Sequence, residues 1–242
     1  MKKPSTTPRP LRAEEFTWRT TRGVMKYLLY LPKDYDGRSG RTWPLLLFLH
    51  GAGERGTNLG RVAIHGPLSQ AKAGQEFPFI IVAPLCPADG QWANEPLLQL
   101  LVRVGRRFAV DMNRVYLTGL SMGGYGTWNL GLAHPEKFAA IAPICGGGEL
   151  ITILLARNYE TNRLAAIKEL GVWAFHGGKD TTVPVEESER TVAFLKQAGC
   201  RDVRLTVYPG AGHNSWVEAY KDSALYEWFL QHERKPIAQA RK

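Results

Sequence analysis

The sequence has little cysteine and contains no long apolar run. Its three cysteines form no C-x-x-C pair and lack Cys/His metal spacing, which argues against a disulfide framework or a zinc module. Cys86 and Cys145 each follow an expected strand, and the sequence leaves open whether they are bridged. No segment resembles a signal peptide or approaches the length of a membrane span. We expect a soluble chain without a membrane partner; its location and oligomeric state stay open.

The formal net charge of +9 is concentrated at the two ends of the chain. Four basic residues precede residue 13 and four follow residue 233, which leaves +1 for the body between them. A nucleic-acid-binding face needs basic side chains clustered on the folded body, so we expect no nucleic-acid partner. The body, 13–233, has an ordinary length for one α/β domain, and we expect it to form a single domain. We predict a disordered basic tail over 1–12 and a basic tail over 234–242.

Two apolar runs, 44–49 and 79–83, lack the polar alternation of a half-exposed strand. Such runs are typical of parallel strands that helices cover on both faces. An antiparallel pair at 15–22 and 24–31 is expected at the sheet edge. Further strands are predicted at 114–118, 139–144, 172–175 and 203–208, and helices at 95–109, 122–133, 185–198 and 216–231. This alternation predicts an α/β fold: a mostly parallel sheet of about eight strands flanked by helices. Only 149–170, one or two helices, offers room for a lid, so the lid is small or missing.

The run 115–126 contains the pattern G-x-S-x-G between an apolar strand and an expected helix. In a nucleophile elbow this pattern places a serine hydroxyl on a sharp turn above a parallel sheet. Gly119 and Gly123 flank Ser121 because a side chain at either position would collide with neighbouring backbone. Since both the strand and the helix are present, we interpret Ser121 as a nucleophile rather than an ordinary loop serine.

A serine nucleophile needs a base within hydrogen-bond reach and a carboxylate that orients the base. Both should follow strands, because the carboxyl ends of parallel strands share one edge. Asp180 follows the strand ending near 175, and His213 follows the last strand. The order Ser121, Asp180, His213 is the one used by strand-turn-helix serine hydrolases. We therefore predict these three residues to be catalytic.

Other acidic and histidine residues fit these roles less well. Asp89, after the fourth strand, is the rival carboxylate, whereas Asp111 and Asp202 precede strands and belong to the opposite edge. The two histidines at strand ends, His50 and His176, are interpreted as loop-shaping groups with satisfied ring nitrogens. The remaining histidines are expected in or beside helices in solvated or packed roles: His65, His134 and His232.

An oxyanion intermediate requires two backbone N–H donors. We predict the N–H of Met122, directly after the nucleophile, and that of Ala52, in the glycine-rich loop 50–56 after the third strand. The alternative for this loop is a phosphate cradle, which the lack of a following G-K-[ST] disfavours.

With these motifs in place, the chain resembles the α/β-hydrolase superfamily over about residues 14–230. Within it, the chain is similar to the phospholipase/carboxylesterase and dienelactone-hydrolase-like group, which includes relatives of feruloyl and acetylxylan esterases. The resemblance is carried by the elbow 119–124, by 50–53, by His176-Gly177 with Asp180 and 183–184, and by Gly212-His213 with Trp216. It implies the α/β-hydrolase fold and serine ester hydrolase activity. Dienelactone hydrolases use a cysteine nucleophile, so Ser121 argues against that reaction.

The predicted reaction is hydrolysis of a carboxylic ester through an acyl-enzyme intermediate, without metal or organic cofactor. A small lid favours short-chain or water-soluble esters, including acetyl or feruloyl esters of carbohydrates. Trp92 and Trp216 are candidates to contact such a substrate, although each could instead be a packed core aromatic. The alternatives are a serine peptidase or amidase on the same fold and a catalytically silent binding module.

Overall fold

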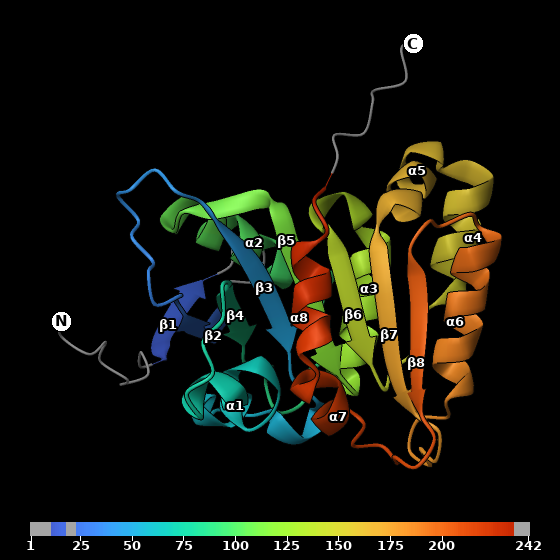
Figure 1. The fold of residues 1–242 in the computed structure, drawn as a ribbon, viewed down its shortest axis with the longest axis horizontal. Coiled ribbons are helices and arrows are strands. Elements are labelled where there is room, and N and C mark those ends of the chain that lie inside the picture. Colours follow the sequence, from blue (N-terminus) through green and yellow to red (C-terminus); the bar gives the residue numbers. More distant parts are fainter. Residues whose placement is uncertain (1–10, 18–22, 235–242) are drawn as a thin grey trace, which may run out of the picture.

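An eight-stranded sheet forms the centre of the molecule, with helices on both of its faces (Figure 1). The computed structural model describes residues 11–17 and 23–234. The strands are β1 (Arg12–Thr17), β2 (Val24–Tyr30), β3 (Trp43–Leu49), β4 (Ile80–Pro84), β5 (Val110–Leu120), β6 (Ala140–Ile144), β7 (Gly171–Gly177) and β8 (Val203–Tyr208). This is the α/β fold that the alternation of apolar runs and helical segments predicts.

The strand order is β1-β2-β4-β3-β5-β6-β7-β8. β2 is antiparallel to β1 and β4, whereas every neighbouring pair from β4 to β8 is parallel. The carboxyl ends of the parallel strands therefore share one edge, at the bottom in Figure 1. Loops that follow β3, β5, β7 and β8 meet there.

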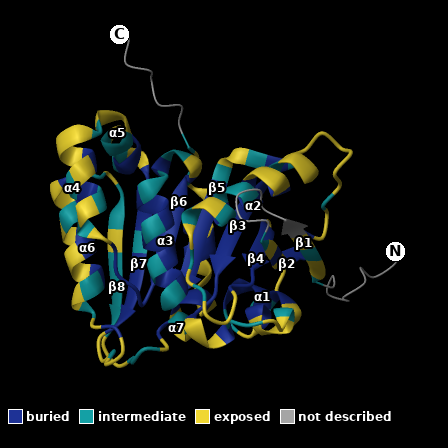
Figure 2. Ribbon diagram, turned by 180° about the vertical axis from the view of Figure 1, so that it is seen from behind, coloured by how far each residue is buried: buried dark blue, intermediate teal, exposed yellow. Residues whose placement is uncertain are grey.

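Two apolar layers hold the helices against the sheet. On one face pack α2 (Asn94–Arg107), α3 (Met122–Ala133), α4 (Leu150–Tyr159), α5 (Thr161–Glu169) and α6 (Glu186–Gln197). On the other pack α1 (Gly66–Lys72), α7 (Trp216–Lys221) and α8 (Ser223–Leu230). Figure 2 shows buried strands between helices whose outward faces are exposed. No helix in the described ranges combines the length and apolar character needed to cross a bilayer.

Short 3-10 turns complete the framework: η1 (Ala52–Glu54), η2 (Leu59–Ala63) and η3 (Pro135–Lys137). α4 and α5 make up most of 149–170, the segment where a small lid could lie. However, α4 packs beside α6, and α5 packs on η3. Because η3 follows the end of α3 and precedes β6, α5 lies at the edge opposite the carboxyl ends, at the top in Figure 1. This pair of helices therefore does not cover the strand ends that carry the candidate site.

The structure differs from the sequence expectations at several boundaries. The single helix expected at 216–231 is wrong, because Asp222 separates α7 from α8 and its carboxylate caps α8 through the N–H of Ala224. α1 was not expected. Arg12, expected in the N-terminal tail, begins β1, and Arg234, expected in the C-terminal tail, donates hydrogen bonds to Glu136 O and Asn113 Oδ1. Residues 1–10, 18–22 and 235–242 lie outside the described residues.

Two valines allow a direct test of the sheet core. Val115 of β5 is fully buried, whereas Val102 of α2 is 50% exposed. Val115→Ala should lower the free energy of unfolding by about 2–3 kcal/mol, because it removes two buried methyl groups and leaves a cavity. Val102→Ala should change it by less than about 0.5 kcal/mol. Urea unfolding of the two variants measures this difference. Equal losses of unfolding free energy would contradict the assignment of Val115 to the sheet core and of Val102 to the exposed face of α2.

Candidate active site

Ser121 lies on a strained turn between the end of β5 and the start of α3. Its backbone angles, φ 52° and ψ −116°, fall outside the regions that residues with side chains ordinarily adopt. The N–H of Ser121 donates to Ile144 O of β6, and its carbonyl accepts from the N–H of Tyr125 in the first turn of α3. The strained conformation is thus held by β6 on one side and α3 on the other.

The glycines around Ser121 are required by close backbone contacts. A Cβ on Gly119 would collide with Gly123 O, and a Cβ on Gly123 would collide with Leu49 O of β3. A Cβ on Gly124 would collide with Ile144 O of β6. These contacts are the mechanical reason for the G-x-S-x-G-G pattern.

The structure brings together the three side chains that the sequence places at separate strand ends. His213 Nε2 is 2.9 Å from Ser121 Oγ, and His213 Nδ1 is 2.8 Å from Asp180 Oδ2. Because a carboxylate only accepts, Nδ1 carries the hydrogen and donates it to Asp180. Nε2 is then free to accept the hydroxyl hydrogen of Ser121, which is the arrangement a general base requires.

Backbone hydrogen bonds join the loop of Asp180 to the loop of His213. The N–H of Gly178 donates to Tyr208 O, and the N–H of Lys179 donates to Ala211 O. A Cβ on Gly177 would collide with backbone of the His213 loop. The two loops therefore approach each other as closely as neighbouring strands, although β7 and β8 have already ended.

The carboxylate of Asp180 is buried and accepts several hydrogen bonds. Burial alone would raise its pKa, but hydrogen bonds from His213 and from the amides of Val183 and Thr182 outweigh burial, and the net pKa is lowered. Asp180 is therefore ionised at neutral pH and can stabilise a protonated His213.

The glycine-rich loop after β3 forms η1, and the predicted donor Ala52 is its first residue and is exposed. The preceding N–H, that of Gly51, donates to the buried carboxylate of Glu54 at 3.0 Å. Arg55 holds the outer side of the loop by donating to Ala52 O and Gly90 O. Met122, the other predicted donor, begins α3, and the first N–H groups of a helix have no intrahelical acceptor.

His50 is buried beneath this loop with both ring nitrogens paired. Nδ1 lies 2.7 Å from Gly51 O and must carry the hydrogen, whereas Nε2 accepts from the N–H of Cys86 at 3.0 Å. Burial lowers the pKa of His50, so the ring is neutral at neutral pH. Trp92 donates its ring N–H to His50 O and packs across Gly126 of α3. The loop, the aromatic side chain and α3 are thus fixed together.

Trp216 packs beside the candidate base. Its ring lies 5.5 Å from the ring of His213, nearly perpendicular to it, and 5.5 Å from the ring of His65. His65 in turn lies 3.8 Å from Glu54. No sequence pattern indicates that His65, which precedes α1, approaches the candidate site, because the contact depends on how α1 packs against α7.

The rival acidic residues lie elsewhere. Asp89 is exposed, and the carboxylate that contacts His213 Nδ1 is that of Asp180. Asp111 pairs with Arg114 near the start of β5, and Asp202 pairs with His232 at 3.0 Å before β8. Both therefore belong to the amino-terminal edge, as their positions before strands predicted.

Cys145 is a buried thiol next to Ser121. It follows β6 with a φ of 43°, and its Sγ lies 3.3 Å from the N–H of Ser121. Burial raises the pKa of Cys145 to about 12, so the thiol stays protonated and is a poor nucleophile. Cys86 and Cys145 are both unbridged. The sequence had no pattern that indicated the contact between Cys145 and Ser121.

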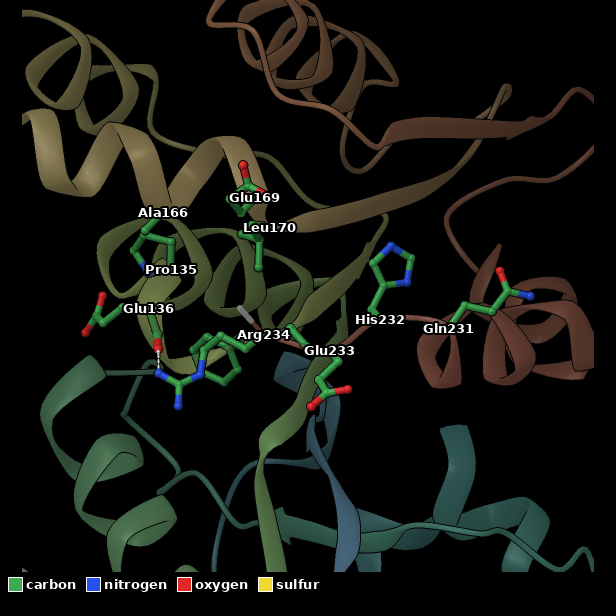
Figure 3. Close-up of a pocket in the computed structure, with 11 residues that line it drawn as sticks. Pro135, Glu136, Ala166, Glu169, Leu170, Gln231, His232, Glu233 and Arg234 are labelled. Carbon is green, nitrogen blue, oxygen red and sulfur yellow. Dashed lines mark hydrogen bonds between the residues drawn. The ribbon is translucent and has the colours of Figure 1, made fainter. Parts of the chain in front are cut away.

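A cavity of about 370 Å³ lies elsewhere in the molecule, and Figure 3 shows the side chains that line it. Its lining comes from η3, from the end of α5 and from 231–234 after α8, and includes Glu136, Glu169, His232 and Arg234. Ala139 and Leu170 of the lining directly precede β6 and β7. The cavity therefore lies at the amino-terminal edge of the sheet, away from Ser121.

A comparison with protein families finds one match to a family model, described as Phospholipase/Carboxylesterase, over residues 89–226. This range includes Ser121, Asp180 and His213. Among curated proteins, acyl-protein thioesterase 1 of Mycosarcoma maydis is 31% identical over 121 residues, which cover 48% of each chain. The chain spans about half the length of the curated relatives it matches.

Solved structures show the same architecture. A thermostable esterase is 32% identical, with a TM-score of 0.76 over 93% of this chain and 63% of that one. A ferulic acid esterase is 18% identical, with a TM-score of 0.69 over 91% of this chain and 95% of that one. The second likeness concerns the fold alone. Together these neighbours identify the sheet and its helices as the fold of α/β-hydrolase esterases.

The neutral His50 should make stability depend on pH. Because its folded pKa lies below the ordinary histidine value of about 6.5, the unfolded chain binds the proton more readily, and stability should fall as pH decreases below that value. The contribution of His50 to stability is fully lost once the pH has fallen below the lowered pKa of the folded protein. Urea unfolding between pH 5 and 8 should show a smaller pH dependence in His50→Gln than in the wild type. Identical pH dependences of the wild type and of His50→Gln would contradict the assignment of His50 as a buried, neutral histidine.

Proposed function

Because the chain belongs to the phospholipase/carboxylesterase family, we propose that it is a serine carboxylic-ester hydrolase that uses Ser121, His213 and Asp180. The observation that carries the proposal is the continuous chain of contacts from Ser121 Oγ through His213 to the buried carboxylate of Asp180. The names of two relatives, a thioesterase and a thermostable esterase, agree with chemistry at an acyl carbon.

In the proposed mechanism Ser121 Oγ attacks the ester carbonyl carbon while His213 Nε2 accepts the hydroxyl proton. The proton then passes from His213 to the departing alcohol, and an acyl-enzyme remains. Water, deprotonated by His213, attacks the acyl-enzyme and releases the acid and the free serine. Asp180 stays ionised throughout and stabilises the imidazolium, which fits its lowered pKa.

The negative charge on the carbonyl oxygen would be stabilised by the N–H groups of Met122 and Ala52. Two features support this assignment. Met122 begins a helix that starts directly at the nucleophile, and the N–H of Gly51 is already committed to Glu54, which leaves Ala52 as the next donor in the loop. Arg55 donates a hydrogen bond to Ala52 O, and Arg61 donates one to Gly53 O; both bonds preorganise the loop for this role.

We infer that the substrates are short-chain or water-soluble esters. α5 lies at the opposite edge of the sheet, and Ser121 and His213 retain partial exposure. Trp92 is hydrogen-bonded to the start of the loop 50–56, and Trp216 packs against the ring of His213. Aromatic rings in these places suit a sugar or aromatic ring attached to the ester, such as an acetyl or feruloyl group on a carbohydrate.

A second candidate activity is hydrolysis of amides or peptides, because the same three residues can act on either bond. It differs in the leaving group, since an amine leaves less readily than an alcohol and depends more strongly on the proton from His213. Matched ester and amide substrates with one acyl group discriminate the two activities. We expect the ester to react faster by a large factor.

Replacing the nucleophile tests the mechanism. Ser121→Ala should abolish hydrolysis of nitrophenyl acetate and labelling by a fluorophosphonate probe, while the unfolding midpoint in urea stays near that of the wild type. Ser223→Ala, at the start of α8, serves as a matched serine control and should keep both activities. Wild-type turnover in Ser121→Ala would remove Ser121 as the nucleophile.

A series of nitrophenyl esters tests the substrate class. Activity, as kcat/KM, should be greatest for acyl chains of about two to four carbons and should fall for longer chains, because α5 lies at the opposite edge of the sheet and leaves Ser121 partly exposed, with little apolar surface to bury a long chain. The series is measured below the micelle concentration of each ester. Activity that rises steadily toward long chains would overturn the proposed preference.

A further inference from the structure

Behind Asp180 lies a second histidine that the proposed mechanism does not use. His176, near the end of β7, is fully buried. Its Nε2 lies 2.9 Å from Val183 O and 3.3 Å from Asp180 Oδ2, and its Nδ1 lies 2.8 Å from Ser188 Oγ on α6. The same carboxylate oxygen therefore contacts two imidazole rings, those of His213 and His176.

The neighbours of Nε2 determine where the ring hydrogen lies. A carbonyl oxygen and a carboxylate oxygen can only accept, so Nε2 of His176 carries a hydrogen. This hydrogen is donated to Val183 O, and Asp180 Oδ2 is a close electrostatic contact of the same N–H group. The positive end of the N–H dipole thus faces the carboxylate that orients His213.

The opposite side of the ring is also fixed. Ser188 Oγ lies between His176 Nδ1 and Gly146 O, at 2.8 Å and 2.9 Å. The single hydroxyl hydrogen points to Nδ1 when that nitrogen carries no hydrogen, and to Gly146 O when Nδ1 itself donates to Ser188 Oγ; in both arrangements Nε2 keeps its hydrogen. The ring is therefore anchored between α6, the loop after β6 and the loop of Asp180.

Val183 links the ring to the other oxygen of the carboxylate. Its carbonyl accepts the hydrogen bond from His176, and its N–H donates to Asp180 Oδ1 at 2.9 Å. His176 therefore holds the turn 180–183 closed around the carboxylate. Since the ring is fully buried, it has no surface with which to touch a substrate.

We propose that His176 is a positioning residue for Asp180, which extends the proposed Ser121-His213-Asp180 arrangement to a buried fourth group. The proposal rests on the function proposed above. Without the Nε2 hydrogen, Asp180 loses a fixed orientation, and its negative charge is less stabilised. The first effect slows the chemical step, and the second favours the protonated form of His213.

Steady-state kinetics of His176→Phe against nitrophenyl acetate tests this role. The value of kcat should fall ~10- to 100-fold, whereas KM should change little. The acid limb of the profile of kcat/KM against pH should move to higher pH, a shift that a purely structural role would not produce. His176→Gln, whose side-chain amide can donate to Val183 O, should recover much of kcat and return the acid limb toward the wild type.

Thr191→Val is the matched control. Thr191 is a buried hydroxyl on α6, one turn beyond Ser188, and it contacts Gly148 N and Glu187 O rather than His176. It should keep the wild-type kcat and pH profile. A folded His176→Phe with wild-type kcat and an unshifted acid limb would overturn the proposal.

Nitrogen NMR of the wild-type histidine rings decides the question even where His176→Phe fails to fold. The expected result is a His176 ring that carries a hydrogen on Nε2, and a ring protonated only on Nδ1 would overturn the proposal. This measurement needs no substrate. A wild type that hydrolyses no ester would therefore refute the proposed function and leave the NMR result on His176 standing.

Discussion

The close contact of Gly123 with Leu49 O is the constraint on which the site depends. It lets α3 begin directly against the end of β3, and Ser121 is forced into its positive-φ conformation by the turn that results. Because Leu49 is the last residue of β3, the same contact sets the distance between the nucleophile and the loop that contains Ala52. One backbone approach thus positions two parts of the proposed chemistry.

A second requirement is the cost of burying a carboxylate. Desolvation of Asp180 would favour its neutral form, which could not stabilise an imidazolium. The fold offsets this cost with the amides of Thr182 and Val183, with His213, and with the N–H group of His176. The charge of the Asp180 carboxylate is therefore a property of the turn 180–183 and of its buried neighbours.

Sequence patterns predicted the parts of this structure that depend on local spacing and strand order. The buried strands, the elbow and the convergence of Ser121, Asp180 and His213 at one edge all follow from apolar runs and from the rule that parallel strands end together. The approach of His65 to Trp216, the place of Cys145 beside Ser121 and the contact of His176 with Asp180 depend instead on packing between segments far apart in the chain. The break at Asp222 was missed because a local cap overrode a continuous apolar pattern.

The position of α4 and α5 has a consequence for the timing of the reaction. In hydrolases with a mobile cover, opening or closing of that cover often limits the rate. Here α4 packs beside α6 and α5 packs on η3 at the far edge of the sheet, whereas the described residues around Ser121 belong to the loops at the strand ends and to the start of α7. For the proposed reaction, α4 and α5 need not be displaced when an ester reaches Ser121, and the rate of turnover would then depend on acylation, deacylation and release of the acid.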